Sequence, residues 1–158
     1  MIDRSRPDSS NDYQAKHAAL ILSSHRRLLG TDLLTPPSAK AGVALYESSC
    51  VVLAHEASAD PVFFYANRAA QTLFEMSWDA LVRLPSRYSA EPLVREERQR
   101  LLERVAAQGY IDDYSGIRIA ASGRRFRIER ATVWNLIDSA GQVIGQAAAF
   151  SEWEPLPE

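Results

Sequence analysis

The residue types that most often carry catalysis are few in this chain, and their spacing does not bring them together. Its single cysteine, Cys50, stands five residues before His55 on a predicted strand, so the two side chains point to opposite faces. Asp112 and Asp113 are adjacent on another predicted strand and diverge in the same way. A small core residue is the expected role of Cys50, and solvated or turn-capping carboxylates are the expected role of the aspartates. We therefore expect no catalytic residues and no enzymatic activity.

Metal and nucleotide binding have no support in the sequence either. His17, His25 and His55 lack the spacing of metal ligands, and no C-x-x-C motif is present. The chain also lacks a P-loop, the G-x-G-x-x-G fingerprint and the G-x-S-x-G nucleophile motif. The sequence predicts no metal site and indicates no particular cofactor.

Arg130 is the residue most suggestive of ligand binding. It shares parity with Phe126, Ile128 and Trp134, so an unbroken strand would direct its guanidinium towards the core. A buried charge needs a partner of opposite charge, because leaving it unpaired in a low-dielectric interior is costly. A ligand carboxylate could be that partner. Two structural alternatives remain open: an internal pair with Glu or Asp, and a bulge that turns Arg130 outward.

Further side chains on the predicted strands and short helices extend this candidate ligand site. Their aromatic rings could line an apolar pocket, and their polar tips could orient a ligand. Ordinary core packing is the alternative for the aromatic residues, and helix capping is a second role for the asparagine. The candidates besides Arg130 are His55, Phe64, Tyr65, Asn67, Trp78 and Trp134.

Arginines also gather in two stretches, for which nucleic-acid binding is one interpretation. They alternate with acidic residues and the net charge of the chain is -2, so a solvated surface is favoured. The residues concerned are Arg95, Arg98, Arg100, Arg104, Arg124, Arg125 and Arg127.

The sheet that must position the candidate residues is predicted mainly from residues 109–150. This stretch alternates apolar and polar residues in three segments, separated by turn signals at 121–123 and 138–141. Two more strands are expected at 45–55 and 62–66, joined across 56–60. Together these segments predict a five-stranded antiparallel sheet.

Helices are expected on one face of this sheet, which gives an α+β fold with an additional N-terminal helix. We expect helices at residues 12–29, 68–74, 77–81 and 92–108, with caps at Asn11 or Asp12, Asn67 and Ser77 and stops at Gly30 and Gly109. Residues 84–92 are expected to resist regular structure. The N-terminal helix has an apolar stripe that must bury against the sheet or a second copy of the chain. The stripe consists of Tyr13, Leu20, Ile21 and Leu28.

Length and composition fit one soluble domain with extensions. The chain has 158 residues, of which 46% are hydrophobic and 24% charged. We expect a disordered tail at 1–11, the helix and a linker at 12–42, the folded domain at 43–152 and a second tail at 153–158. The single cysteine, the polar start and the absence of a long apolar run predict a cytoplasmic protein that does not contact a membrane.

The order of the predicted elements, with Asn67-Arg68-Ala69-Ala70 opening the short helix after the second strand, resembles a PAS domain. At finer grain, residues 12–152 resemble the MEKHLA domain, a PAS-related family found in small bacterial proteins and in plant class III homeodomain-leucine zipper transcription factors. The similar blocks are VVLAHEASADPVFFYANRAAQTLFEMSWDALVRLPSRYSAEPLVREER and GYIDDYSGIRIAASGRRFRIERATVWNLID. The chain departs from the commoner PAS pattern at Phe74-Glu75-Met76, where a glycine usually follows the short helix.

The resemblance implies a sensory or ligand-binding module. Flavin-binding light sensors of this fold carry the motif Asn-Cys-Arg-Phe-Leu-Gln, which is absent here, and residues 92–108 lack the histidine that usually binds haem. The expected function is a PAS-like sensor that binds a small, partly apolar, anionic molecule and signals as a homodimer or through a partner protein. A ligand-free interaction module and a small α+β enzyme are the alternatives.

Overall fold

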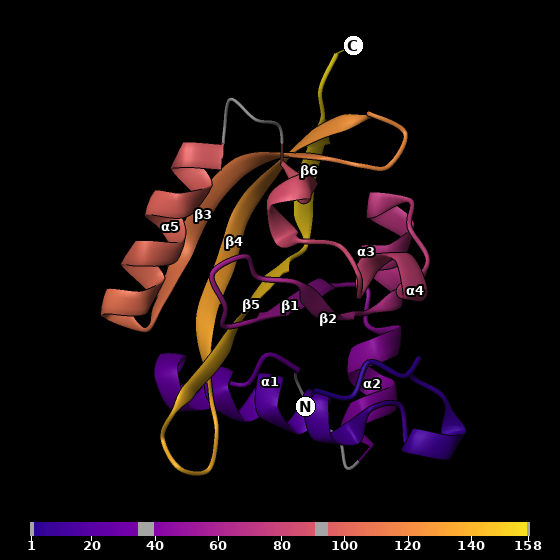
Figure 1. Ribbon diagram of the computed structural model, residues 1–158, viewed down its shortest axis with the longest axis vertical. Coiled ribbons are helices and arrows are strands. Elements are labelled where there is room, and N and C mark those ends of the chain that lie inside the picture. Colours follow the sequence, from indigo (N-terminus) through magenta and orange to yellow (C-terminus); the bar gives the residue numbers. More distant parts are fainter. Residues whose placement is uncertain (1, 35–39, 91–94, 158) are drawn as a thin grey trace.

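The structure, a computed structural model, describes residues 2–34, 40–90 and 95–157, and these form an antiparallel sheet surrounded by helices (Figure 1). The strand order is β2-β1-β5-β4-β3, and the last strand, β6, pairs with β4 beyond the end of β5. This confirms the expected five-stranded sheet and adds β6 to it. The strands are β1 (Val51–Glu56), β2 (Phe63–Ala66), β3 (Tyr110–Ile119), β4 (Arg125–Ile137), β5 (Val143–Phe150) and β6 (Glu152–Pro155).

Local capping chemistry explains where several of the helices begin and end. Asn67 accepts a hydrogen bond from the Ala70 amide at 3.1 Å, and Ser77 accepts one from the Ala80 amide at 3.2 Å. Gly30 and Gly109, with φ of 76° and 93°, follow the two long helices. The helices are η1 (Ser9–Asn11), α1 (Ala15–Leu29), α2 (Ala41–Glu47), α3 (Arg68–Phe74), α4 (Trp78–Leu81), η2 (Ser86–Ser89) and α5 (Arg95–Gln108).

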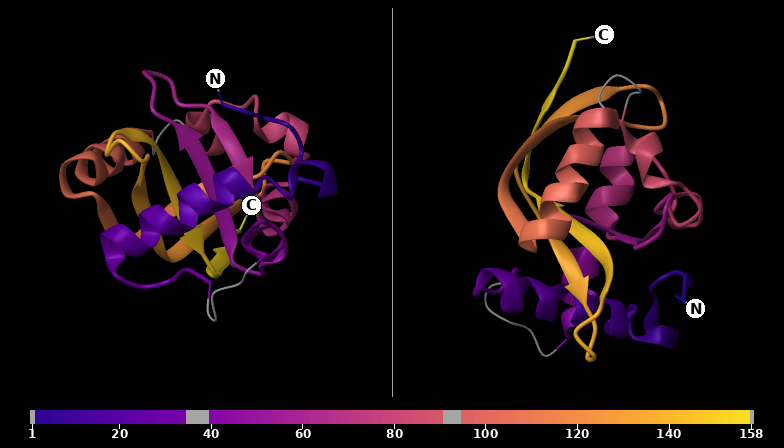
Figure 2. Two further views of the ribbon diagram at one scale, coloured as in Figure 1. Left: turned by 90° about the horizontal axis from the view of Figure 1, so that it is seen from below. Right: turned by 60° about the vertical axis from the view of Figure 1, so that its left-hand side comes forward.

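The sheet is covered on both faces. On one face, Leu101 and Val105 of α5 pack on Val133, and α3 packs through Phe74. On the other face, Ile21 of α1 packs against Trp134 in a separate core cluster. Figure 2 shows α1 lying across the strands, away from α3 and α5. Ile21 of the apolar stripe is fully buried, and Tyr13, Leu20 and Leu28 are partly buried against the same cluster. The stripe therefore packs on the sheet of its own chain, which is the first of the two expected alternatives.

A bulge in β4 decides which side chains reach each face. Arg130 adopts a left-handed conformation with φ of 49°, and the register of β4 against β3 shifts beside it. Because one extra residue reverses the alternation, Phe126 and Ile128 join the core beneath α3, whereas Trp134 faces α1. The expectation that Phe126, Ile128 and Trp134 share one face is therefore wrong.

The N-terminal residues also differ from the expected disordered tail. Arg4 forms an ion pair with Glu56 at 2.7 Å, and its carbonyl accepts a hydrogen bond from the indole of Trp78 at 2.9 Å. Asp12, Tyr13 and Gln14 have φ between 52° and 55°, so α1 begins at Ala15 rather than residue 12.

Three other boundaries differ from those predicted. Residues 45–47 belong to α2 instead of the first strand, and residues 86–89 form the 3-10 helix η2 instead of an irregular loop. Residues 153–155 of the expected tail belong to β6. The expected start of the long helix at residue 92 and part of the expected linker, 35–39, lie outside the described residues. No helix in the described ranges is long and apolar enough to cross a membrane.

Candidate ligand-binding pocket

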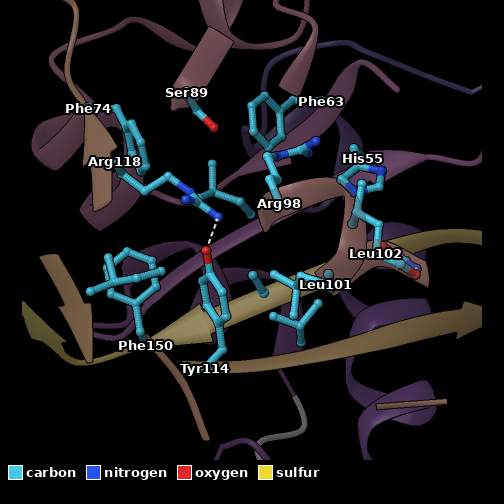
Figure 3. A pocket seen from close by; sticks show the side chains of 16 residues that line it. His55, Phe63, Phe74, Ser89, Arg98, Leu101, Leu102, Tyr114, Arg118 and Phe150 are labelled. Atoms are coloured by element: carbon cyan, nitrogen blue, oxygen red, sulfur yellow. Dashed lines mark hydrogen bonds between the residues drawn. The ribbon is translucent and has the colours of Figure 1, made fainter. Parts of the chain in front are cut away.

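A pocket of about 60 Å³ lies between α5 and the sheet face that also carries α3 (Figure 3). Most of its wall is apolar and comes from strands β1, β4 and β5 and from α5. Polar groups enter this wall at a few points only, which is the usual composition of a small-molecule site. The polar lining residues are His55, Ser89, Arg98, Tyr114, Arg118 and Gln146.

Arg98 reaches the pocket from α5. It precedes Leu101 and Val105 by three and seven residues, so it lies on the buried side of the helix. Only 8% of Arg98 is exposed, and its guanidinium donates a hydrogen bond to the Ser86 hydroxyl. Burial, together with the charge of Arg118, lowers the pKa of Arg98 to about 10, so the group stays protonated near neutral pH.

Arg118 reaches the same pocket from β3 and is also 8% exposed. It donates hydrogen bonds to the Ile117 carbonyl at 2.9 Å and to the Tyr114 hydroxyl at 2.8 Å (Figure 3). Gly116 makes this arrangement possible, because a Cβ there would stand 2.1 Å from the Tyr114 hydroxyl oxygen. The side chain of Tyr114 can thus lie over the strand and meet Arg118.

The two guanidinium groups have neutral partners only. In the described part of the chain, neither Arg98 nor Arg118 has a carboxylate within 4.0 Å. Taking an ion out of water costs several kcal/mol unless opposite charge or hydrogen bonds compensate for it. The pocket therefore carries two buried guanidinium groups without an ion-pair partner among the described side chains, and Asp60 acts on Arg98 only at longer range.

His55 and Gln146 supply hydrogen-bond acceptors to the pocket. Burial, with a smaller effect of the Arg98 charge, lowers the pKa of His55 to about 4, so its imidazole is neutral at pH 7. Its Nδ1 lies 2.9 Å from the Glu56 carbonyl, which can only accept, so Nδ1 carries the hydrogen and Nε2 is an acceptor. Gln146 donates through Nε2 to Asn135 at 3.2 Å, while its buried Oε1 has no donor.

Arg130 does not lie in this pocket, and the expectation that it points into the core is wrong. The bulge turns its side chain outward, where it is 79% exposed and lies 3.4 Å from Glu152. The outward alternative is the one observed.

The aromatic candidates lie on the other side of β1 and β4 from the pocket or near the sheet edge. Trp134 donates to the Ile21 carbonyl at 3.2 Å beneath α1. Tyr65 and Trp78 pack edge to face with 5.8 Å between ring centroids, and Phe64 packs against His17. Of the predicted candidates, only His55 lines the pocket.

Asn67 is a structural connection between three segments. Its Oδ1 accepts hydrogen bonds from the amides of Val52 and Ala70, each at 3.1 Å. Its Nδ2 donates to the carbonyls of Leu45 at 3.1 Å and Cys50 at 2.7 Å. All four hydrogen-bonding positions of the amide are thus used within the protein.

The two arginines that dominate the pocket were not predicted. The acidic neighbours of Arg98 in the sequence predict a solvated position, and Arg118 is not among the expected ligand-binding residues. The spacing from Arg98 to Leu101, Leu102 and Val105 was the available signal for Arg98. For Arg118 it was the cross-strand pairing with Phe126, which places both on one face.

Fold comparison places the chain among PAS-like domains. The PAS domain of a protein from Colwellia psychrerythraea matches with a TM-score of 0.59 and 14% identity, over 72% of this chain and 92% of that one. An RNA-binding light-oxygen-voltage receptor matches with a TM-score of 0.61 and 16% identity, over 76% and 36%. The light-state dimer of the fungal photoreceptor Vivid matches with a TM-score of 0.59 and 12% identity, over 84% and 91%. At these identities the likeness shows the fold alone.

The model of the MEKHLA domain family matches residues 15–155, and the chain belongs to this family. Both the fold and the family expected from the sequence are thereby confirmed. No curated protein sequence matches the chain.

Proposed function

We propose that this chain is a sensory module that binds a small molecule in the pocket between α5 and the sheet. The observation that carries the proposal is the pair of buried arginines, which face one cavity and form hydrogen bonds only to neutral groups among the described residues. A core that served stability alone would gain more from apolar residues of similar volume. Membership of a PAS-related family and the sensory proteins among the fold relatives support the same role.

The pocket is proposed to bind its ligand without converting it. His55 is the one lining residue of the type that usually acts as a base, and the hydrogen bond described for its ring is to the Glu56 carbonyl. A base that activates a nucleophile needs that nucleophile within hydrogen-bond reach. We therefore favour a receptor role over an enzymatic one.

The bound state is proposed to reach other molecules through β6. Phe150 forms part of the pocket wall, and its ring packs edge to face on Trp153 with 6.1 Å between centroids. Only Ser151 separates β5 from β6, whose residues are all exposed. Because the α1 stripe already packs on the sheet and every residue of β6 is exposed, β6 is the better candidate for a contact with a second copy or a partner protein.

Native mass spectrometry of the chain purified from its source organism tests the proposal. We expect a retained small molecule, and we expect it to be lost in Ala148→Leu, which fills the pocket from β5 while leaving both arginines in place. Circular dichroism would confirm that this variant is folded. Absence of any retained mass, together with no binding from a metabolite library, would contradict the proposal.

A ligand-free interaction module is the second candidate. Large apolar side chains that remain exposed favour it, namely Tyr88, Val143 and Trp153. In that case Ala148→Leu would stabilise the chain by filling a void without affecting self-association. Substitution Trp153→Glu would abolish the association instead, as measured by light scattering after size-exclusion chromatography.

A further inference from the structure

The unused hydrogen-bond donors of the pocket indicate the charge of its ligand. A guanidinium has five N–H donors in a planar fork and no acceptor. Among the described residues, Arg98 uses one donor on Ser86 and Arg118 uses two, on Ile117 and Tyr114. The remaining donors can bond to solvent or to a ligand, and a planar anion can pair with such forks through two parallel hydrogen bonds.

The size of the pocket limits the ligand. A buried water needs about 10–15 Å³ of cavity volume. The pocket, at about 60 Å³, therefore has room for about four to six non-hydrogen atoms. A flavin or a haem is far larger than this space.

The apolar wall distinguishes between kinds of anion. Leu53, Phe63, Leu101, Val133 and Phe150 contribute hydrocarbon surface opposite or beside the arginines. Phosphate and sulfate carry polar oxygens on every side, so some of these would be left against hydrocarbon without a donor. A carboxylate with an alkyl chain can direct its charge to the arginines and its hydrocarbon to this wall.

We propose that the pocket binds a short-chain monocarboxylate of about four to six non-hydrogen atoms, with its carboxylate between Arg98 and Arg118. Acetate, propionate and butyrate fall within this class. The inference rests on the proposed sensory function and specifies the ligand of the same pocket.

The test is an NMR titration of the full chain with sodium butyrate, butyramide and sodium phosphate at constant ionic strength and pH 7.5. Butyramide has nearly the shape of butyrate without its charge, so it isolates the contribution of the anion. We expect butyrate to shift amide signals of α5, β3 and β5, and to bind at least about tenfold more tightly than butyramide or phosphate.

Variants of the two arginines test whether these side chains recognise the charge of the ligand. Arg98→Gln and Arg118→Gln are each expected to weaken butyrate binding by about tenfold or more. Arg104→Gln is the matched control, because Arg104 lies exposed on the same helix and does not line the pocket. If an arginine variant does not fold, Ala148→Leu keeps both charges and should still abolish butyrate binding by occupying the cavity.

Each contrary result has a separate meaning. Equal binding of butyramide and butyrate, or tighter binding of phosphate, would overturn the carboxylate assignment while leaving a ligand site in place. Failure of acetate, propionate and butyrate to bind would overturn it too, and a retained mass that Ala148→Leu removes would still support the sensory function. Butyrate binding that survives Ala148→Leu would place the anion elsewhere on the protein and contradict the inference.

Discussion

Replacing His55 by glutamine should remove part of the acid sensitivity of the fold. Burial lowers the pKa of His55 from 6.5 to about 4, with Arg98 acting in the same direction and Glu56 in the opposite one. Above pH 6.5 the ring is neutral in both the folded and the unfolded chain, so its titration costs no stability there. Between pH 6.5 and about 4 only the unfolded chain takes up the proton, so the free energy of unfolding falls as the pH falls. The difference between the pKa of 6.5 in the unfolded chain and about 4 in the folded chain corresponds to a loss of about 3 kcal/mol in the free energy of unfolding.

Urea unfolding of the wild type and of His55→Gln at pH 7.5, 6.5, 5.5 and 4.5 measures this contribution. Carboxylates titrate in both proteins, so the difference between the two curves isolates the imidazole. Between pH 7.5 and 4.5, the free energy of unfolding should fall further in the wild type than in the variant, and this extra loss should be most of the total of about 3 kcal/mol. His17→Gln, at a half-buried position on α1, serves as a second histidine-to-glutamine variant outside the pocket. Parallel curves for the wild type and His55→Gln would refute the conclusion that burial keeps the imidazole neutral.

Three further predictions concern residues outside the pocket. Asn67→Ala should lower the free energy of unfolding by about 3 kcal/mol or more, because four backbone groups lose a partner in hydrogen bonds that are buried or, at Cys50, part-buried. A loss below about 1 kcal/mol in urea unfolding would contradict the role of Asn67 as a connection. Tyr65→Phe should leave stability unchanged or raise it by up to about 1 kcal/mol, since its buried hydroxyl has no hydrogen-bond partner among the described residues. The matched Tyr46→Phe loses a hydrogen bond from Gln71 at 3.0 Å and should destabilise. The free energy of unfolding of Arg130→Gly should stay within about 1 kcal/mol of the wild type, because glycine accepts φ of 49° and the exposed ion pair contributes little. Butyrate binding should be unchanged. Weaker butyrate binding in calorimetry would show that Arg130 contributes to the ligand site after all.

The elements that local chemistry determines were predictable. Asn67 and Ser77 begin helices because their side chains accept amide hydrogen bonds of the first turn, whatever the rest of the fold does. Gly141 has φ of 79° in a turn where the Asp138 carboxylate accepts two amide hydrogen bonds, each at 2.9 Å. Such signals depend only on neighbours in sequence, so they fixed the order of elements and, through it, the PAS-like topology.

The bulge at Arg130 explains why the predicted positions of Arg130 and Trp134 were wrong, because one extra residue reversed the alternation of β4. Arg130 is neither glycine nor asparagine, so its residue type does not predict a left-handed conformation or a bulge. In an unbroken strand, Trp134 would lie on the same face as Ile128, which is the pocket face. Because of the bulge, Val133 takes that position and Trp134 packs beneath α1. Arg98 was missed for a different reason: its acidic neighbours suggested a solvated helix face, although its own spacing places it on the buried one.

Small residues in the central strand explain how the sheet holds a helix on one face and a pocket on the other. Ala147 and Ala149 of β5 face the cluster that contains α1 residues, and Ala148 lies between Leu53 and Val133 on the opposite face. On the first face the short side chains let α1 approach closely enough for Trp134 to reach the Ile21 carbonyl. On the second face the missing volume at Ala148 leaves space between the larger neighbours and α5, which is where Arg98 enters. Burial of β1 and β5 on both faces also explains why their sequences are apolar at successive positions rather than alternating. The space of the pocket thus results from the small side chains of β5, and its charges come from α5 and β3. Ala148→Leu tests the space, and Arg98→Gln tests the charge.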